Sequence, residues 1–209
     1  MPVPEVITGG KTTNERILDT LKKISNPFER VMIFVDGGYL QKVCENVLGK
    51  YSIDFEELAK GIVYKYNSLP DNPFQADLIR VYYFDAIVDG GHPDYSTQKD
   101  FFDSIEKVNC YTVILADLIE SSNKGFKQKG VDVQMAISAL DKTYQNQYDT
   151  AIFLMGDRDF LPLIKAVKDV GKKTLIVCYE KNTAVDLMAC FDRRVLLEKE
   201  DIESWALDK

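Results

Sequence analysis

The chain has 209 residues, of which 45% are hydrophobic and 11% aromatic, enough for one domain with a full apolar core and too many for a mainly disordered protein. Its formal net charge is −7, whereas modules that bind nucleic acid through electrostatics alone carry a basic surface. The composition therefore counts against such a module and fits a protein whose carboxylates gather around a cation.

The first predicted element is a short helix within a leader that comprises residues 1–29. Residues 1–11 contain Pro, Gly and Thr without periodicity, whereas segment 14–24 repeats apolar residues at helical spacing. Asn26-Pro27 ends that segment, because the residue before a proline disfavours the helical conformation. Residues 30–209 are predicted to form the folded domain.

The domain alternates between predicted strands and predicted helices. Apolar runs typical of buried strands lie at residues 31–35, 78–85, 111–119, 150–155, 173–179 and 194–197. Helical patterns lie at about residues 38–48, 54–67, 94–108, 131–144, between Gly156 and Gly171, and at 183–190. This alternation predicts an α/β fold of three layers, in which helices cover both faces of a mostly parallel central sheet.

Two segments of the domain carry more specific expectations. The helix at 131–144 is predicted to have one apolar stripe, because four apolar residues follow the i, i+3, i+4, i+7 pattern. They are Val133, Ala136, Ile137 and Leu140. Segment 120–130 is polar and is predicted to be a loop. It carries Lys124, Lys127 and Lys129.

Four aspartates stand where this fold brings side chains together. Asp36 follows the first strand, and both Asp157 and Asp159 follow the fourth. Asp132 lies at the start of the helix that precedes the fourth strand. If the first and fourth strands are neighbours in a parallel sheet, these carboxylates meet beyond the carboxyl ends of the strands, where such sheets bind their ligands.

Converging carboxylates are typical of a site for Mg²⁺ or Mn²⁺. Both ions prefer oxygen ligands, retain several waters and bind substrate phosphate oxygens. Such a cation activates water for attack on a phosphodiester and neutralises charge at the phosphorus. The single histidine, His92, lies in the turn Gly90-Gly91-His92-Pro93, which argues against histidine-based catalysis.

Each aspartate also has a purely structural interpretation. Asp157 and Asp159 are suited to capping a helix or to its first turn, and Asp132 lies near a helix start as well. Asp36, followed by two glycines, is a common turn residue. The joint placement of all four at strand ends or helix starts is what favours a site.

Three motifs in this order resemble the NYN domains, the PIN-like nucleases that include the LabA-like bacterial proteins. They are Phe34-Val35-Asp36-Gly37-Gly38-Tyr39-Leu40, Lys129-Gly130-Val131-Asp132-Val133 and Gly156-Asp157-Arg158-Asp159-Phe160-Leu161-Pro162-Leu163. Gly171-Lys172-Lys173 before a strand is also similar, and the resemblance covers roughly residues 30–198. It implies a PIN-like, Rossmann-like fold and metal-dependent ribonuclease activity.

The resemblance further implies that Asp36, Asp132, Asp157 and Asp159 are the catalytic and metal-binding carboxylates. The bound cofactor would be Mg²⁺ or Mn²⁺ and the partner RNA, with single strands favoured. Many relatives have asparagine where Tyr39 stands. A PIN-like RNA-binding or protein-binding regulatory module with weak or no catalysis is therefore the alternative.

Further side chains near the motifs are candidates for contacts with RNA or with the site. Lys129, Lys127, Lys124 and Arg158 are candidates for phosphate contacts, although loop lysines are more often simply solvated. Tyr39 is a candidate stacking surface for a base. Asp85, at the end of the second strand, is a candidate outer acid of the site.

The remaining expectations concern surroundings. No apolar run approaches the ~20 residues that span a bilayer, and the start of the chain lacks the order of a secretory signal, so a cytoplasmic protein without membrane contact is expected. The four cysteines are scattered and form no CxxC motif, which fits a reducing compartment. The sequence leaves a homo-oligomer open. No Gly-rich loop with Gly-Lys-Ser/Thr is present, which argues against a P-loop NTPase.

Overall fold

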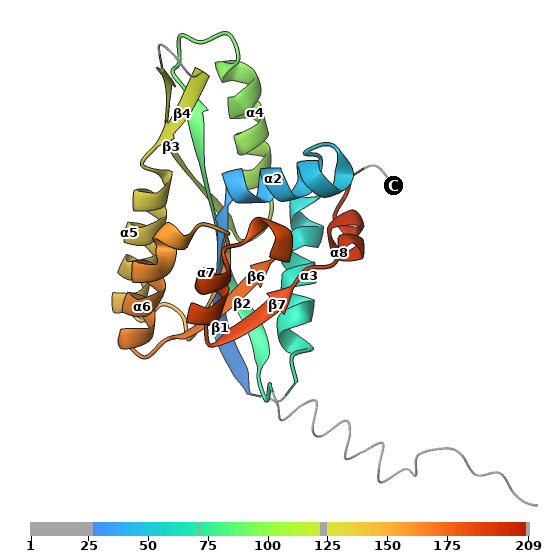
Figure 1. Cartoon of the computed structure of the whole chain (residues 1–209), viewed down its shortest axis with the longest axis vertical. Helices are drawn as coiled ribbons and strands as arrows, with labels where there is room; N and C mark the ends of the chain where they lie inside the picture. Colours follow the sequence, from blue (N-terminus) through green and yellow to red (C-terminus); the bar gives the residue numbers. More distant parts are fainter. Residues whose placement is uncertain (1–26, 71, 122–124, 208–209) are drawn as a thin grey trace, which may run out of the picture.

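The computed structural model describes residues 27–70, 72–121 and 125–207, with residues 119–121 and 125–129 described by their backbone alone. The segment 14–24, predicted to be a short helix, and Lys124 lie outside these residues. The described part of the chain folds around one seven-stranded sheet (Figure 1).

Six of the seven strands run parallel, in the order β3-β2-β1-β5-β6-β7. Their bounds are β1 Phe28–Asp36, β2 Gln75–Val88, β3 Tyr111–Ser121, β5 Thr150–Leu154, β6 Lys173–Cys178 and β7 Arg193–Leu196. β4, Gly125–Lys129, pairs antiparallel with β3 at the edge. The chain first builds the sheet from β1 toward β3 and then returns to the other side of β1, as doubly wound sheets do.

Helices lie on both faces of the sheet, which gives the three predicted layers (Figure 1). One face carries α3 (Phe55–Asn67) and α4 (Tyr95–Glu106), while the other carries α5 (Val131–Tyr144) and α6 (Leu161–Asp169). Three more helices adjoin these: α2 (Gly37–Leu48), α7 (Val185–Cys190) and α8 (Lys199–Ser204). The 3-10 turns are η1 (Arg158–Phe160) and η2 (Glu180–Asn182). The predicted α/β fold with a mostly parallel sheet is confirmed.

Strand β4 corrects the prediction that residues 120–130 form a loop. The backbone of Gly125–Lys129 pairs with Asp117–Ser121, so the segment extends the sheet as an edge hairpin. Its polar sequence hides the strand, because an edge strand with two polar faces lacks the apolar run that marks a buried one. The backbones of Lys127 and Lys129 belong to this strand.

Helix α5 is present, but only two residues of its predicted apolar stripe, Ala136 and Leu140, pack against the core. Val133 and Ile137 are 59% and 63% exposed, whereas Val131, Met135 and Ala139 are buried against the sheet. Both sets have helical spacing, and periodicity alone does not say which of two apolar faces turns inward.

The C-terminal helix α8, which the sequence analysis did not predict, is tied to the domain by Trp205. Its indole is 2% exposed, and a Cβ placed on Gly61 of α3 would lie only 2.6 Å from its Nε1. The backbone N–H of Asp54 donates to the carbonyl of Trp205 over 2.7 Å. Glycine at position 61 therefore lets the indole approach the α3 backbone directly.

Two simpler features accompany the fold. Cys44 and Cys178 are buried, as expected for small core residues, whereas Cys110 is exposed. Of the helices in the described ranges, none combines the length and the apolar character that crossing a bilayer requires.

Replacing Trp205 with alanine is expected to lower the free energy of unfolding by about 3–5 kcal/mol, because the buried indole leaves a large cavity between α8 and α3. Leu207, which is 61% exposed, provides the control, and Leu207→Ala is expected to change stability by less than about 0.5 kcal/mol. Urea denaturation measures both values. Equal stability of the two variants would show that α8 does not pack as described.

Candidate functional site

The site lies where the direction of strand order changes, between β1 and β5. These strands are hydrogen-bonded neighbours in parallel register, with Val35 opposite Leu154. Asp36 ends β1, and Asp157 follows β5 after two further residues. The expectation that the first and fourth predicted strands are adjacent is therefore confirmed, and their aspartates meet at one edge of the sheet.

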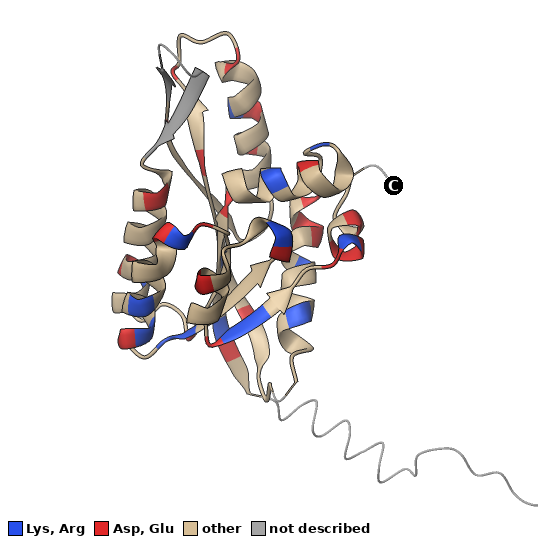
Figure 2. Cartoon of the chain, in the orientation of Figure 1, with Lys and Arg blue, Asp and Glu red and all other residues tan. Residues whose placement is uncertain are grey.

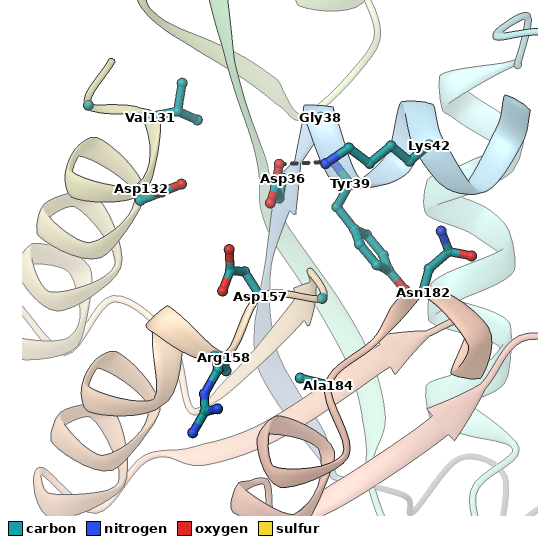
Figure 3. Close-up of a pocket in the computed structure, with 12 residues that line it drawn as sticks. Asp36, Gly38, Tyr39, Lys42, Val131, Asp132, Asp157, Arg158, Asn182 and Ala184 are labelled. Atoms are coloured by element: carbon teal, nitrogen blue, oxygen red, sulfur yellow. Dashed lines mark hydrogen bonds between the residues drawn. The ribbon is translucent and has the colours of Figure 1, made fainter. Parts of the chain in front are cut away.

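A pocket of about 530 Å³ opens at this edge (Figure 3). Carboxylates from β1, α5 and the segment after β5 line one side, and residues of α2 and of the β6–α7 connection line the other. The lining residues are Asp36, Gly38, Tyr39, Lys42, Gly130, Val131, Asp132, Gly156, Asp157, Arg158, Asn182 and Ala184. Three of the four predicted acids are among them.

Asp36 is both a helix cap and the least solvated acid of the pocket. Its side chain accepts a hydrogen bond of 3.0 Å from the backbone N–H of Tyr39 at the start of α2. Burial, together with the smaller effects of the charges of Asp132 and Asp85, raises its pKa to about 6 against the opposing effects of the Tyr39 N–H and the Lys42 ammonium. The carboxylate is thus held in place and is short of counter-charge.

Asp157 and Asp132 approach Asp36 from the other two elements. Asp157 caps η1, and its side chain accepts from the N–H of Asp159 over 2.9 Å. Asp132 lies in the first turn of α5, directly after Gly130, whose φ of 87° turns the chain from β4 into the helix. Burial raises the pKa of Asp132, and the charges of Asp157 and Asp159 raise it further. The capping interpretation is therefore correct for Asp157, whereas Asp36, interpreted from sequence as a turn residue, is the N-cap of α2. In both residues the cap coexists with a place in the pocket.

The other two acidic candidates lie beside the pocket. Asp159 is exposed and does not line it, although its charge acts on Asp132. Asp85 is 8% exposed behind Gly37, where it accepts hydrogen bonds from the Tyr83 hydroxyl and the Ala86 N–H. Burial raises the pKa of Asp85, and its charge reaches Asp36.

The donor set fits a hydrated divalent cation better than a preassembled cage. Within the described ranges, no three His, Cys, Asp or Glu side chains lie close enough to bind one ion together. Mg²⁺ usually keeps several waters and takes only one or two carboxylates together with substrate phosphates. Oxygens suited to that mode of binding are offered by three carboxylates that form no ion pair within the described ranges, those of Asp36, Asp132 and Asp157.

The cationic candidates are placed unequally. Arg158 lines the pocket but forms an ion pair with Asp186 of α7, with Nη2 and Oδ2 3.1 Å apart. Figure 3 shows its side chain pointing away from the carboxylate of Asp157. Contacts of Lys127 and Lys129 with RNA stay predictions, because only the backbone of these residues is described, and the same holds for Lys124 outside the described ranges.

Tyr39 connects α2 to the opposite side of the pocket. Its ring is 7% exposed and lies over Gly156, where a Cβ would be 2.4 Å from the ring. Its hydroxyl accepts from the N–H of Tyr179 over 2.9 Å and lies 2.8 Å from the Thr183 hydroxyl. Because the Thr183 hydroxyl itself donates to the Tyr179 carbonyl, Tyr39 donates to Thr183. Stacking of a base on Tyr39 stays a prediction, while the contacts described here give the residue a packing role.

The sequence analysis missed Lys42 and Asn182, which line the pocket opposite the acids. Lys42 follows Gly38 by four residues and so lies on the same face of α2, a signal that helical spacing contains. Asn182 ends the turn η2 in the β6–α7 connection. No local pattern marks it, because only the tertiary fold brings that connection to the pocket.

Asp36→Asn is expected to stabilise the metal-free protein at pH 7. A folded pKa of about 6 lies above the ordinary value of 3.8. The protonated Asp36 carboxyl therefore makes its full contribution to the free energy of unfolding below about pH 4, and this contribution is lost as the pH rises through 6. Asparagine keeps an acceptor for the Tyr39 N–H and removes the buried charge. Removing that charge is expected to raise the free energy of unfolding by about 1–3 kcal/mol at pH 7.

Urea denaturation in EDTA at pH 7 and pH 4 measures this difference, and the advantage of the variant is expected to vanish at pH 4. Asp169→Asn, an exposed change on α6, is the control and is expected to alter stability by less than about 0.5 kcal/mol at either pH. An Asp36→Asn variant less stable than the parent at pH 7 would contradict the described environment of this carboxylate.

Comparisons with known proteins agree with this architecture. The chain is 32% identical over 82 residues to the uncharacterized protein MJ0482 of Methanocaldococcus jannaschii, a match that covers 37% of this chain and 34% of the relative. The chain thus matches about a third of that relative's length. The crystal structure of VPA0982, a protein of unknown function from Vibrio parahaemolyticus, superposes with a TM-score of 0.62. That match has 18% identity and covers 88% of this chain and 99% of the other, so it shows a shared fold.

The family model named NYN domain matches residues 30–198, which include all three motifs and every carboxylate of the pocket. NYN domains are generally nucleases of the PIN-like superfamily. The match extends over most of the chain, and the chain therefore belongs to the NYN domain family.

Proposed function

We propose that this protein is a divalent-metal-dependent ribonuclease that hydrolyses RNA phosphodiester bonds. The observation that carries the proposal is the placement of Asp36, Asp132 and Asp157 around one pocket, although they come from three elements far apart in the sequence. Membership of a family that is generally nucleolytic and binds RNA supports this reading.

The charges of the pocket explain why a metal ion would be required. Burial and mutual repulsion raise the pKa values of Asp36 and Asp132, so these side chains already lack counter-charge. A phosphodiester brought against them would add a further negative charge and be repelled. Mg²⁺ or Mn²⁺ is thus needed before the substrate can approach the acids, and when bound the ion supplies Lewis-acid chemistry and a more acidic water.

The protein's own part is to hold three carboxylates at fixed positions. Asp36 is fixed by the N–H of Tyr39 and Asp157 by the N–H of Asp159, both within hydrogen-bond distance. Asp132 is carried on the first turn of α5, whose inner face is buried in the core. These positions leave oxygens available to orient a hydrated cation and, through it, a phosphate group.

The test is cleavage of an end-labelled single-stranded RNA with Mn²⁺, with Mg²⁺ or with EDTA. The parent is expected to cleave only with a metal ion, and Asp157→Asn is expected to lower the rate at least about 100-fold. Asp169→Asn, on the exposed side of α6, is the control and should keep the parent rate. Equal rates for Asp157→Asn and the parent would overturn the proposal.

A second candidate is a PIN-like module that binds RNA or protein without turnover. It is favoured by Tyr39, which stands where many relatives have asparagine and which packs against Gly156 and the β6–α7 connection. Binding of RNA in EDTA, with no cleavage by the parent under any metal condition, would support this candidate over the nuclease.

A further inference from the structure

The pocket has a second side whose chemistry differs from that of the acids. Asp36, Asp132 and Asp157 form the acidic rim, and Lys42 and Asn182 form what we call the second rim. Figure 3 shows the two rims facing each other across the pocket, with Tyr39 between Lys42 and Asn182. The second rim thus offers an ammonium and an amide, both of which donate hydrogen bonds to phosphate oxygens.

Lys42 is held close to the acids without being neutralised by one of them. It is exposed on α2, and its charge acts on Asp36. Figure 3 shows its side chain reaching back along α2 toward Asp36, the direction in which helical side chains lean. No ion pair involves Lys42 within the described ranges, whereas Arg158 is engaged by Asp186. Basic and acidic residues are scattered over the helices in Figure 2, and Lys42 is the single basic residue of α2.

Asn182 is positioned by the contacts of Tyr39. The Tyr39 hydroxyl bonds to Tyr179 and Thr183, which flank Asn182 in the β6–α7 connection. A Cβ on Gly156 would be 2.5 Å from the carbonyl oxygen of Asn182, so this connection also rests directly on the end of β5. The N–H of Ala184 donates to the Gly156 carbonyl over 3.0 Å. The loop is therefore fixed to both α2 and β5.

From this arrangement we propose that Lys42 and Asn182 form a phosphate-binding subsite for the backbone of RNA, placed opposite the cation-binding acids. The inference rests on the proposed nuclease function. A phosphate of the RNA between the rims would face the acids and their cation on one side and the second rim on the other. The RNA would therefore be bound through its backbone and not through a base. The subsite contributes affinity and position, and the acids contribute the chemistry.

Binding to RNA distinguishes this subsite from a merely solvated lysine. The assay is fluorescence anisotropy of a labelled single-stranded RNA with Mg²⁺, in an Asp157→Asn background so that the RNA stays intact. Lys42→Ala is expected to weaken binding about tenfold and to reduce the slope of log K against log salt by about 0.7, as loss of one phosphate contact on a single strand does. Lys42→Arg should restore the slope.

The proposed subsite also predicts different RNA affinities for two variants of Asn182, one uncharged and one negatively charged. Asn182→Ala is expected to weaken binding about threefold with an unchanged salt slope, because no charge is lost. Asn182→Asp should weaken it more than Asn182→Ala, since it adds a negative charge facing the phosphate. Lys165→Ala on the outer side of α6 removes a lysine remote from the pocket and should change neither affinity nor slope.

The outcomes separate this inference from the proposed function. If the parent cleaves RNA but Lys42→Ala keeps the affinity and slope of its background, the subsite is wrong and the nuclease stands. If the parent never cleaves while Lys42→Ala weakens RNA binding as expected, the subsite stands and the nuclease is wrong. If the Asp157→Asn background binds no RNA, while the parent cleaves none, both are wrong.

Discussion

The parallel pairing of β1 with β5 is the constraint on which the site depends. The two strands are separated in sequence by the whole of β2, β3 and β4 with their helices, yet they are hydrogen-bonded from Val31–Thr150 to Val35–Leu154. The paired residues of both strands are all buried between two layers of helices, so a slip in register would exchange side chains between the two packed faces and disrupt the core. Fixing the register in this way fixes where Asp36 and Asp157 emerge, because each follows its strand at a set distance.

The same residues then serve two purposes that oppose each other. The capping bonds of Asp36 and Asp157 stabilise the starts of α2 and η1, and they also hold the carboxylates near one another. Burial and the charges of Asp132 and Asp85 disfavour the charged form of Asp36, whose pKa is raised to about 6. A cation would compensate this buried negative charge and so bind more tightly to the folded protein than to the unfolded chain. The large apolar core around β1 and β5 offsets the cost when no ion is bound.

The sequence predicts those parts of the structure that are determined by patterns of neighbouring residues. Apolar runs identify the six parallel strands, and acids after strand ends or at a helix start identify three residues of the pocket. Other features depend on tertiary contacts that a local pattern does not contain. The polar edge strand β4 is stabilised by its pairing with β3, and α5 chooses between two apolar faces only when it meets the sheet. Asn182 is brought to the pocket by the hydrogen bonds of the Tyr39 hydroxyl to Tyr179 and Thr183. No pattern in the sequence around Asn182 predicts this position.

Tyr39 differs from the residue that the family resemblance leads us to expect, and its contacts show what the tyrosine does in this chain. Where many relatives have asparagine, this chain places a ring against Gly156 and a hydroxyl in the β6–α7 connection. Packed in this way, Tyr39 forms part of the wall of the pocket, and the acids on the other side keep their places. Asn182 lines the same wall, and its backbone carbonyl adjoins Gly156. The loop that Tyr39 fixes therefore supplies the amide of Asn182 to the same side of the pocket as α2, opposite the acids.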